Sequence, residues 1–368
     1  MYTKKNIPVF LILGVTVSGI ALYLAFRKVP FSDLTLYILA IDYLWIIPST
    51  LAILISFALR AYRWQIILEP ARKVSFWGAF HPLMISFMIN CILPGRVGEL
   101  ARPAILKKNE NVPFSTGLAT VAAERAFDVC LLIILFAVIF ATVQIDPNLD
   151  IPFNQYHLNR ETLLLIGAGI LKLFALLIVG IIMLSIPATR GIINKAIERI
   201  PSLFFFASVA FKEKVQKFVA TPLLRFIENF AAGLTMVRYP AKIAICFGLS
   251  FLIWCLAAAS YYIMAQGCPG IELSFAELSA VMIIICFFIA LPSVPGFWGI
   301  WEAGGVFALS LFGVSLKDAA GFTLANHAVQ LVPVVVAGLI SAMITGVNIW
   351  QVSYEDVSTE QKEYRNGI

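Results

Sequence analysis

The chain has 368 residues, of which 60% are hydrophobic and 13% charged, and its formal net charge is +6. Soluble domains contain about half apolar and about a quarter charged residues, so this composition excludes an ordinary water-soluble enzyme or binding domain. The apolar surface must instead face a lipid bilayer, and the positions of the few charges then indicate how the chain crosses it.

Apolar segments of about 20 residues, the length that crosses a bilayer as a helix, recur along the chain. The first, 7–26, is too long for the apolar part of a signal peptide and is interpreted as a retained span. Two other apolar stretches, 77–93 and 275–291, each run into a segment broken by Pro and Gly and then into a weaker apolar stretch. The remaining predicted spans are 43–59, 126–143, 162–186, 242–265 and 319–347.

Lysine and arginine gather in the polar connections 60–73, 102–110 and 187–242, whereas acidic residues predominate in 144–161. Short loops rich in Lys and Arg stay on the cytoplasmic side of a membrane. The first three connections are therefore predicted to be cytoplasmic and the fourth external.

The apolar stretch 77–93 lies between two connections assigned to the same side. It is therefore predicted to enter from the cytoplasm, turn at Pro94 and Gly95, and return through 96–106 as a re-entrant hairpin. By the same reasoning, 275–313 forms a second hairpin that enters from the external face. The predicted fold class is an all-α integral membrane protein with about six transmembrane helices and two re-entrant helical hairpins. Both termini are predicted to lie in the cytoplasm, and the location is predicted to be a bacterial type of inner membrane.

The two halves of the chain, approximately 1–145 and 160–347, have the same predicted order of elements in opposite orientation. Inverted repeats whose interrupted segments correspond are typical of transporters with a site near the midplane. Chance similarity is the alternative, since Pro and Gly are frequent in membrane helices. The halves form one predicted domain, 1–347, followed by a polar cytoplasmic tail, 348–368. The linker 187–240 is predicted to form amphipathic helices on the inner leaflet, or else a solvated loop.

Ionisable side chains at bilayer depth cost at least ~2.5–3.5 kcal/mol each on insertion scales, so they are usually paired and functional. Arg96, Glu99 and Arg102 recur every third residue and are predicted to lie along one side of a helix that begins after Pro94. Other charges are predicted to close the second span and to open the one after the first hairpin. The candidate substrate-binding residues are Arg60, Arg63, Arg96, Glu99, Arg102, Glu124, Arg125, Asp128 and Glu302.

The charges of the first half are interpreted as a network in a cytoplasm-facing cavity that receives an anionic headgroup. Arginine suits this role because its guanidinium group pairs with phosphate through two parallel hydrogen bonds. The start of a half-helix inside the membrane would add unpaired N–H groups for the same anion. The alternative is that Arg96–Glu99 and Arg125–Asp128 are ion pairs that only lock the hairpin together.

The second hairpin carries a single charge, Glu302, between Trp298 and Trp301 and ahead of His327. The tryptophans are interpreted as interfacial anchors. Alternatively, they line an external cavity in which Glu302 meets a cationic or polar group. His327 is predicted to be a satisfied polar residue and not a metal ligand, because no second His or Cys lies nearby in sequence.

No cofactor and no enzymatic activity are predicted. The six cysteines show no metal-binding or disulfide spacing, and the sequence contains no phosphate-binding loop for ATP. An enzyme would need a nucleophile with a neighbouring base, and no sequence motif partners His81, His157 or His327 with Ser, Cys or Asp.

Four segments resemble the lysylphosphatidylglycerol synthetase transmembrane family, also called flippase-like membrane proteins. They are Arg60–Trp64, Leu93–Pro103, Glu124–Asp128 and Pro292–Glu302, and the resemblance extends over about 7–347. It implies a lipid flippase-type domain with two re-entrant regions and cavities on opposite faces. Two-domain members of the family move aminoacylated phosphatidylglycerol made by a cytosolic transferase domain. Only 18 residues follow Trp350, so we expect a stand-alone member without the transferase domain.

The predicted function is translocation of an anionic or aminoacylated phospholipid, or a related lipid carrier, between bilayer leaflets. The predicted partners are phospholipid headgroups, a separate lipid-modifying transferase and a second copy of the chain, with no nucleic acid. The alternative is a non-catalytic scaffold or accessory subunit for a lipid or polyprenyl-linked glycan transferase.

Overall fold

The computed structural model describes the protein in segments separated by short gaps. These segments are residues 7–93, 96–142, 150–153, 156–159, 186–204, 208–221, 239–291 and 294–347, with isolated positions between 161 and 227. The predicted tail 348–368, most of the predicted span 162–186 and the turn residues Pro94 and Gly95 lie outside the described residues.

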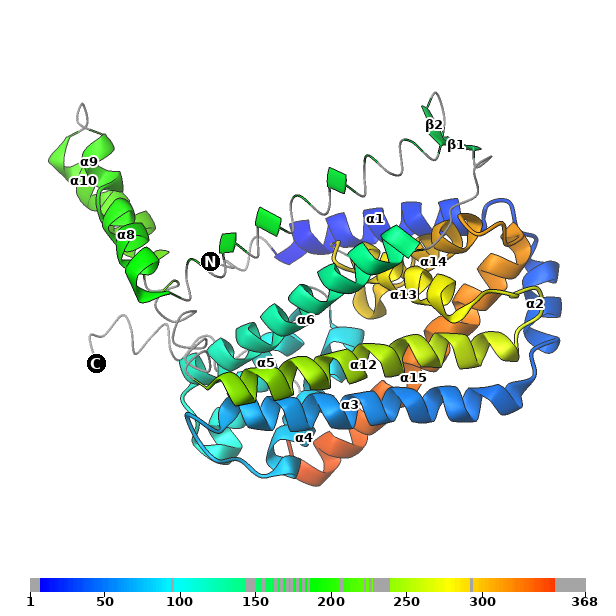
Figure 1. Ribbon diagram of the computed structural model, residues 1–368, viewed down its shortest axis with the longest axis horizontal. Helices are drawn as coiled ribbons and strands as arrows, with labels where there is room; N and C mark the ends of the chain where they lie inside the picture. The colour runs from blue at the N-terminus through cyan, green and yellow to red at the C-terminus, as the bar shows by residue number, and fades with distance from the viewer. Residues whose placement is uncertain are drawn as a thin grey trace.

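The described residues are almost entirely helical, which confirms the predicted all-α class (Figure 1). A two-stranded antiparallel hairpin, β1 and β2, lies within the connection predicted to be external. The elements are α1 Ile7–Phe26, α2 Phe31–Leu39, η1 Tyr43–Trp45, α3 Ile46–Leu68, α4 Phe76–Ile92, α5 Gly98–Glu110, α6 Phe114–Thr142, β1 Asp150–Phe153, β2 Tyr156–Asn159, α8 Pro187–Glu198, α9 Ile200–Leu203, α10 Val209–Val215, η3 Gln216–Ala220, α12 Pro240–Gln266, α13 Phe275–Ile289, η5 Pro295–Phe297, α14 Ile300–Ser310 and α15 Leu316–Thr345.

Three of the described helical segments are long and apolar enough to cross a membrane: Tyr43–Leu68, Pro240–Gln266 and Leu316–Thr345. They contain α3, α12 and α15. Two further predicted spans correspond to α1, with 20 residues, and α6, with 29 residues. The apolar helices α4 and α13 are shorter, with 17 and 15 residues, as expected for segments that enter a membrane and turn back.

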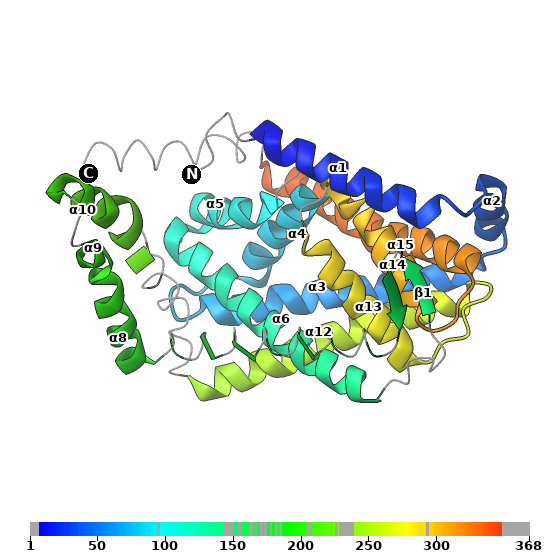
Figure 2. The same ribbon diagram turned by 90° about the horizontal axis from the view of Figure 1, so that it is seen from above.

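The two broken segments lie at opposite ends of the helical body. The pair α4 and α5 enters from the end where α1 begins, whereas α13 and α14 enter from the end that carries α2 (Figures 1 and 2). Within each pair the two helices pack together, and α4 also contacts η5 at the turn of the other pair. The turn of the second hairpin therefore lies against the first hairpin.

The order long, short, short, long occurs twice, first in α3–α6 and then in α12–α15. Helices at corresponding positions of the two sets pack together. In the first set α3 packs against α4 and α5 against α6, and in the second set α12 packs against α13 and α14 against α15. The two sets join mainly where α3 lies along α12, and there Ser49 and Ser260 are hydrogen-bonded at 2.8 Å. This order agrees with the predicted repeat, while its exact inversion stays a prediction.

Two helix boundaries correct the predicted ones. The helix α3 continues to Leu68, beyond the predicted end at residue 59, and α6 begins at Phe114, twelve residues before the predicted start at residue 126. Hydropathy ends a predicted span at the first charged side chains, but a helix continues through them when other helices neutralise the charges. The charged residues at these positions therefore lie well inside helices.

Helical segments of the linker 187–240 pack around Ile197, Ala220 and Ile227. Their exposed face carries apolar side chains, such as Phe211 and Phe218, close to Lys212 and Lys217. Contact of this face with the inner leaflet stays a prediction.

Candidate functional site

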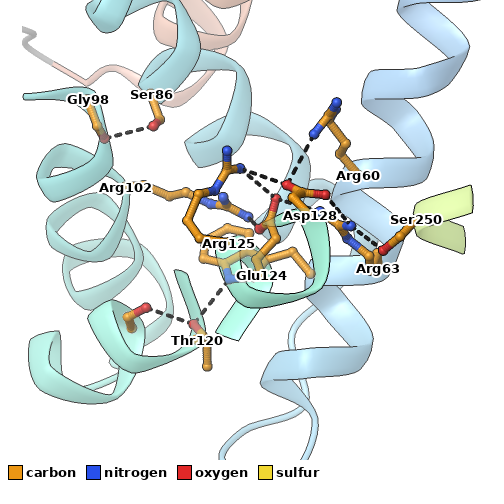
Figure 3. A network of polar contacts seen from close by, with 12 residues as sticks. Arg60, Arg63, Ser86, Gly98, Arg102, Thr120, Glu124, Arg125, Asp128 and Ser250 are labelled. Carbon is orange, nitrogen blue, oxygen red and sulfur yellow. Dashed lines mark hydrogen bonds and ion pairs between the residues drawn. The ribbon is translucent and has the colours of Figure 1, made fainter. Parts of the chain in front are cut away.

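Six charged residues form one buried network between α3, α5 and α6 (Figure 3). The pairs within it join Arg60 and Arg63 of α3, Arg102 of α5, and Glu124, Arg125 and Asp128 of α6. All six are among the residues predicted from the sequence. On α3, Arg60 and Arg63 are three residues apart, and on α6, Glu124 and Asp128 are four apart, spacings that place each pair on the same side of its helix.

Arg63 is the centre of this network. Its Nη1 donates to Asp128 Oδ1 at 2.7 Å and also to the Ser250 hydroxyl of α12, while Nη2 donates to Glu124 Oε1 at 3.2 Å. The side chain is fully buried. One guanidinium group therefore holds both carboxylates of α6 and links α3 to α6 and α12.

Arg102 connects the first hairpin to Glu124. Its Nη2 donates to Glu124 Oε2 at 2.6 Å, and its guanidinium carbon lies 3.5 Å from the centroid of the Trp64 ring. Trp64 is itself held by Thr120, because its Nε1 donates to the Thr120 hydroxyl at 3.1 Å. Stacking on an aromatic face is a favourable arrangement for arginine, so Trp64 and Thr120 orient Arg102 toward Glu124.

Arg60 and Arg125 lie at the edge of the network. Arg60 Nη1 is 3.5 Å from Asp128 Oδ2, and the guanidinium group lies 5.2 Å from the Trp254 ring centroid. Arg125 Nη2 is 3.2 Å from Glu124 Oε1 and 3.5 Å from Asp128 Oδ2. Its side chain is 36% exposed, against at most 10% for the other five. Arg125 is therefore the member through which a solvent or lipid group can reach the network.

The network contains more positive charge and more hydrogen-bond donors than its own carboxylates can satisfy. Four guanidinium groups face two carboxylates. In the described part of the chain, the buried Nε atoms of Arg63, Arg102 and Arg125 have no hydrogen-bond partner. Buried charge without a partner is costly, so this arrangement is suited to an acceptor-rich anion such as a phosphate group. The described residues contain no cluster of three or more ligands suited to a metal ion.

The predicted stripe of Arg96, Glu99 and Arg102 on one helix is wrong. Arg96 precedes α5 and has a left-handed backbone conformation with φ 55°, so it belongs to the turn. Its Nη2 donates to the Ile289 carbonyl of α13 at 2.7 Å, and its guanidinium group lies 5.8 Å from the Phe297 ring centroid. Arg96 therefore bridges the two hairpins instead of joining the network.

Glu99 lies in the first turn of α5 and forms no ion pair among the described residues, although its carboxylate is near enough to act electrostatically on Arg125. The predicted Arg96–Glu99 ion pair is therefore absent from the described structure. The predicted Arg125–Asp128 pair is present at 3.5 Å.

Glu302 occupies a separate position in the second half. Its side chain is fully buried, its Oε1 lies 2.6 Å from His327 Nδ1, and its Oε2 accepts from the Gly299 N–H at 2.6 Å. His327 stacks on Trp301 with 4.5 Å between ring centroids and 4° between ring planes. The described contacts thus give Glu302 a partner from within the chain.

Some contributors gave no signal in the sequence. Thr120 and Ser250 are ordinary polar residues, and only the tertiary structure places their hydroxyl groups on Trp64 and Arg63. The contact between His81 and Ser341 gave no signal either: His81 Nδ1 lies 3.1 Å from the Ser341 hydroxyl. These two residues are 260 positions apart, so no local motif could reveal the pair.

Residues 11–338 match the family described as the lysylphosphatidylglycerol synthase TM region. A UPF0104 membrane protein of Methanocaldococcus jannaschii is 23% identical over 262 residues, which cover 71% of this chain and 95% of that protein. Glycosyltransferase AglD of Haloferax volcanii is 23% identical over 338 residues, which cover 84% of this chain. The match covers 50% of the length of AglD.

Proposed function

The chain belongs to the lysylphosphatidylglycerol synthase transmembrane family, and we propose that it moves lipids with anionic headgroups between the two leaflets of a membrane. It is a multi-pass membrane protein. The observation that carries the proposal is the buried network of Arg60, Arg63, Arg102, Glu124, Arg125 and Asp128, with its excess of guanidinium groups inside the helical body.

The proposed substrate is a phospholipid or a polyprenyl carrier whose phosphate pairs with guanidinium groups. Arg125 receives the phosphate because it is the exposed member of the network and its Nε has no hydrogen-bond partner among the described residues. Glu124 and Asp128, which contact Arg125, keep other arginine partners, since Glu124 also pairs with Arg63 and Arg102 and Asp128 also pairs with Arg63. An aminoacylated headgroup would in addition bring a positive charge that Glu99 can accept.

We further propose an orientation from the Lys and Arg distribution. The end of the body that carries the connection between α3 and α4 faces the cytoplasm, and the end that carries α2 faces outward. The first hairpin then opens to the cytoplasm and the second to the outer face (Figure 2). Lipid acyl chains stay in the bilayer while the headgroup passes the point where the two hairpin turns meet.

Reconstitution into vesicles tests this function. Fluorescent phosphatidylglycerol and a fluorescent polyprenyl phosphate are expected to change leaflet faster in vesicles with the protein than in empty vesicles. Fluorescent phosphatidylcholine serves as the zwitterionic comparison and is expected to move more slowly. Equal rates with and without protein for every anionic lipid would contradict the proposal.

Substitution of Arg125 by Gln is expected to slow the movement of anionic lipid by about ten- to a hundredfold, because a charged hydrogen bond to phosphate contributes about 1.5–3 kcal/mol. The thermal unfolding midpoint in detergent is expected to change little, since Glu124 and Asp128 keep their other arginines. Arg72→Gln, on the exposed connection after α3, is the matched control and is expected to leave both measurements unchanged. A wild-type transport rate for Arg125→Gln would place the headgroup elsewhere.

The likeness to AglD favours a second candidate, an accessory subunit for a transferase that acts on lipid-linked glycans. A subunit of this kind would keep its partner bound in Arg125→Gln. A translocator would lose movement of anionic lipid in the same variant while it stays folded. Measuring partner assembly and lipid movement on Arg125→Gln separates the candidates.

A further inference from the structure

A buried acid–base pair lies in the second half, outside the arginine network. Glu302 near the start of α14 and His327 inside α15 are 2.6 Å apart, and their side chains are 0% and 1% exposed. Ionisable groups at bilayer depth are costly, so those that occur are usually paired and functional. This pair combines one acid with one base, so its net charge depends on how many protons the two groups share.

The imidazole ring of His327 lies against two tryptophan rings. The Trp301 ring is stacked on it, and the Trp298 ring centroid is also 4.5 Å away. Nδ1 contacts Glu302, while Nε2 is buried and has no hydrogen-bond partner among the described residues. One nitrogen is therefore committed to the acid, and the other is a free position for a proton.

Glu302 also controls the shape of the second hairpin turn. Its Oε2 accepts from the Gly299 N–H, so the carboxylate caps the start of α14. Gly296, Phe297 and Gly299 have φ angles of 70°, 61° and 84°, so the segment from η5 to the start of α14 contains three residues with positive φ. Phe297 lies under the guanidinium group of Arg96. A change in the charge of Glu302 therefore acts on the turn that touches the first hairpin.

We propose that Glu302 and His327 form the proton-binding site that couples lipid movement to a proton gradient. A proton from water adds to His327 Nε2, and the proton on Nδ1 passes to Glu302 Oε1. The carboxylate becomes a neutral acid and the ring stays neutral, so the pair gains one proton and loses one negative charge. A neutral acid accepts the Gly299 N–H more weakly than a carboxylate does, which loosens the cap of α14 and the turn beside Arg96.

Other titratable groups near the pair are few in the described structure, and none of them forms a hydrogen bond or ion pair with Glu302 or His327. On α1, the ionisable side chain of Tyr23 is exposed. The acidic residues of α13 and α15, Glu277 and Asp318, lie in the first turns of these helices, at the end of the helical body (Figure 2). Tyr261 of α12 lies beside Asn326, the residue before His327, and Arg96 of the first turn donates to the Ile289 carbonyl of α13.

This inference rests on the proposed function, and vesicles with an imposed pH gradient test it. Wild-type protein is expected to move fluorescent phosphatidylglycerol several-fold faster with the gradient than without it. Glu302→Gln and His327→Gln are each expected to move this lipid at the same rate with and without the gradient. The amide oxygen that Glu302→Gln introduces can still accept the Gly299 N–H, so the fold of this variant is retained.

The chain offers a matched control at Glu277, which caps the start of α13 through Ser274 in the same geometry but at the end of the helical body. Glu277→Gln is expected to keep the full response to the gradient. Loss of the response in Glu277→Gln as well would overturn the assignment to Glu302, because any capping carboxylate would then have the same effect.

A second measurement separates the inference from the proposed function. Infrared difference spectra of the detergent-solubilised protein on acidification are expected to show the carbonyl band of a protonated carboxylic acid, absent in Glu302→Gln. If wild-type protein moves lipid at the same rate with and without the gradient, the coupling is overturned and the function stands. If no lipid moves under any condition, the function fails. The infrared band then decides the proton site: its presence supports the site, and its absence overturns it.

Discussion

Replacing Arg63 by Met is expected to destabilise the protein by about 3–5 kcal/mol and to abolish lipid movement. Arg63 bonds Glu124, Asp128 and Ser250 at once, so its loss leaves two buried carboxylates short of a partner. Removing one side of a buried ion pair has this cost because the remaining charge cannot return to water. Methionine nearly preserves the volume, which separates the loss of charge from the loss of packing. The measurement is thermal or denaturant unfolding in detergent, followed by the vesicle assay.

Two further variants make this result specific. Arg72→Met removes an arginine from the exposed connection after α3 and is expected to leave stability unchanged. Adding Asp128→Asn to Arg63→Met is expected to recover part of the stability, because the unpaired carboxylate is then neutral. Independent, additive effects of the two substitutions would show that Arg63 and Asp128 do not interact in the membrane.

Replacing Gly98 by Ala is expected to separate the two helices of the first hairpin. The Gly98 N–H donates to Asn90 Oδ1 at 2.8 Å, and the Gly98 carbonyl accepts from the Ser86 hydroxyl at 2.7 Å. A Cβ atom at this position would overlap the Ser86 carbonyl oxygen and would lie 2.7 Å from Asn90 Oδ1. Because the first obstacle is backbone, α5 must move away from α4.

The expected cost of Gly98→Ala is about 1–3 kcal/mol, the usual range for overpacking a close contact. Lipid movement is expected to fall strongly, since α5 also carries Arg102 to Glu124. Gly248→Ala on α12 is the control: its Cβ would meet nothing within 4 Å, and alanine favours a helix over glycine by about 1 kcal/mol. A wild-type unfolding midpoint for Gly98→Ala would refute the close approach of α4 and α5.

The helices that are apolar throughout were predictable to within a few residues. The predicted segments 77–93 and 242–265 correspond to α4, Phe76–Ile92, and to α12, Pro240–Gln266. Transfer from water to lipid is a sum over neighbouring side chains, so a local stretch of sequence is sufficient to find such helices. The prediction failed where Arg60 or Glu124 interrupts the apolar pattern, because hydropathy counts the charge without the partner that compensates it.

The residue types of the arginine network were also predictable, since charges in apolar segments stand out. Their pairing was not. Arg63 and Glu124 are 61 residues apart, and Arg63 and Ser250 are 187 residues apart. The position of Arg96 required the backbone as well, because a left-handed turn residue points away from the helix that the three-residue spacing suggested.

The sequence by itself determined that this chain is a membrane protein, where its apolar helices lie, and which charged residues interrupt its apolar segments. These properties follow from composition and from short-range patterns, which depend on neighbours along the chain. The tertiary structure alone decided that Arg63 joins three helices, that Arg96 links the two hairpin turns, and that Glu302 pairs with His327. Each of these contacts joins residues from separate helices, and the packing of those helices selects the partner.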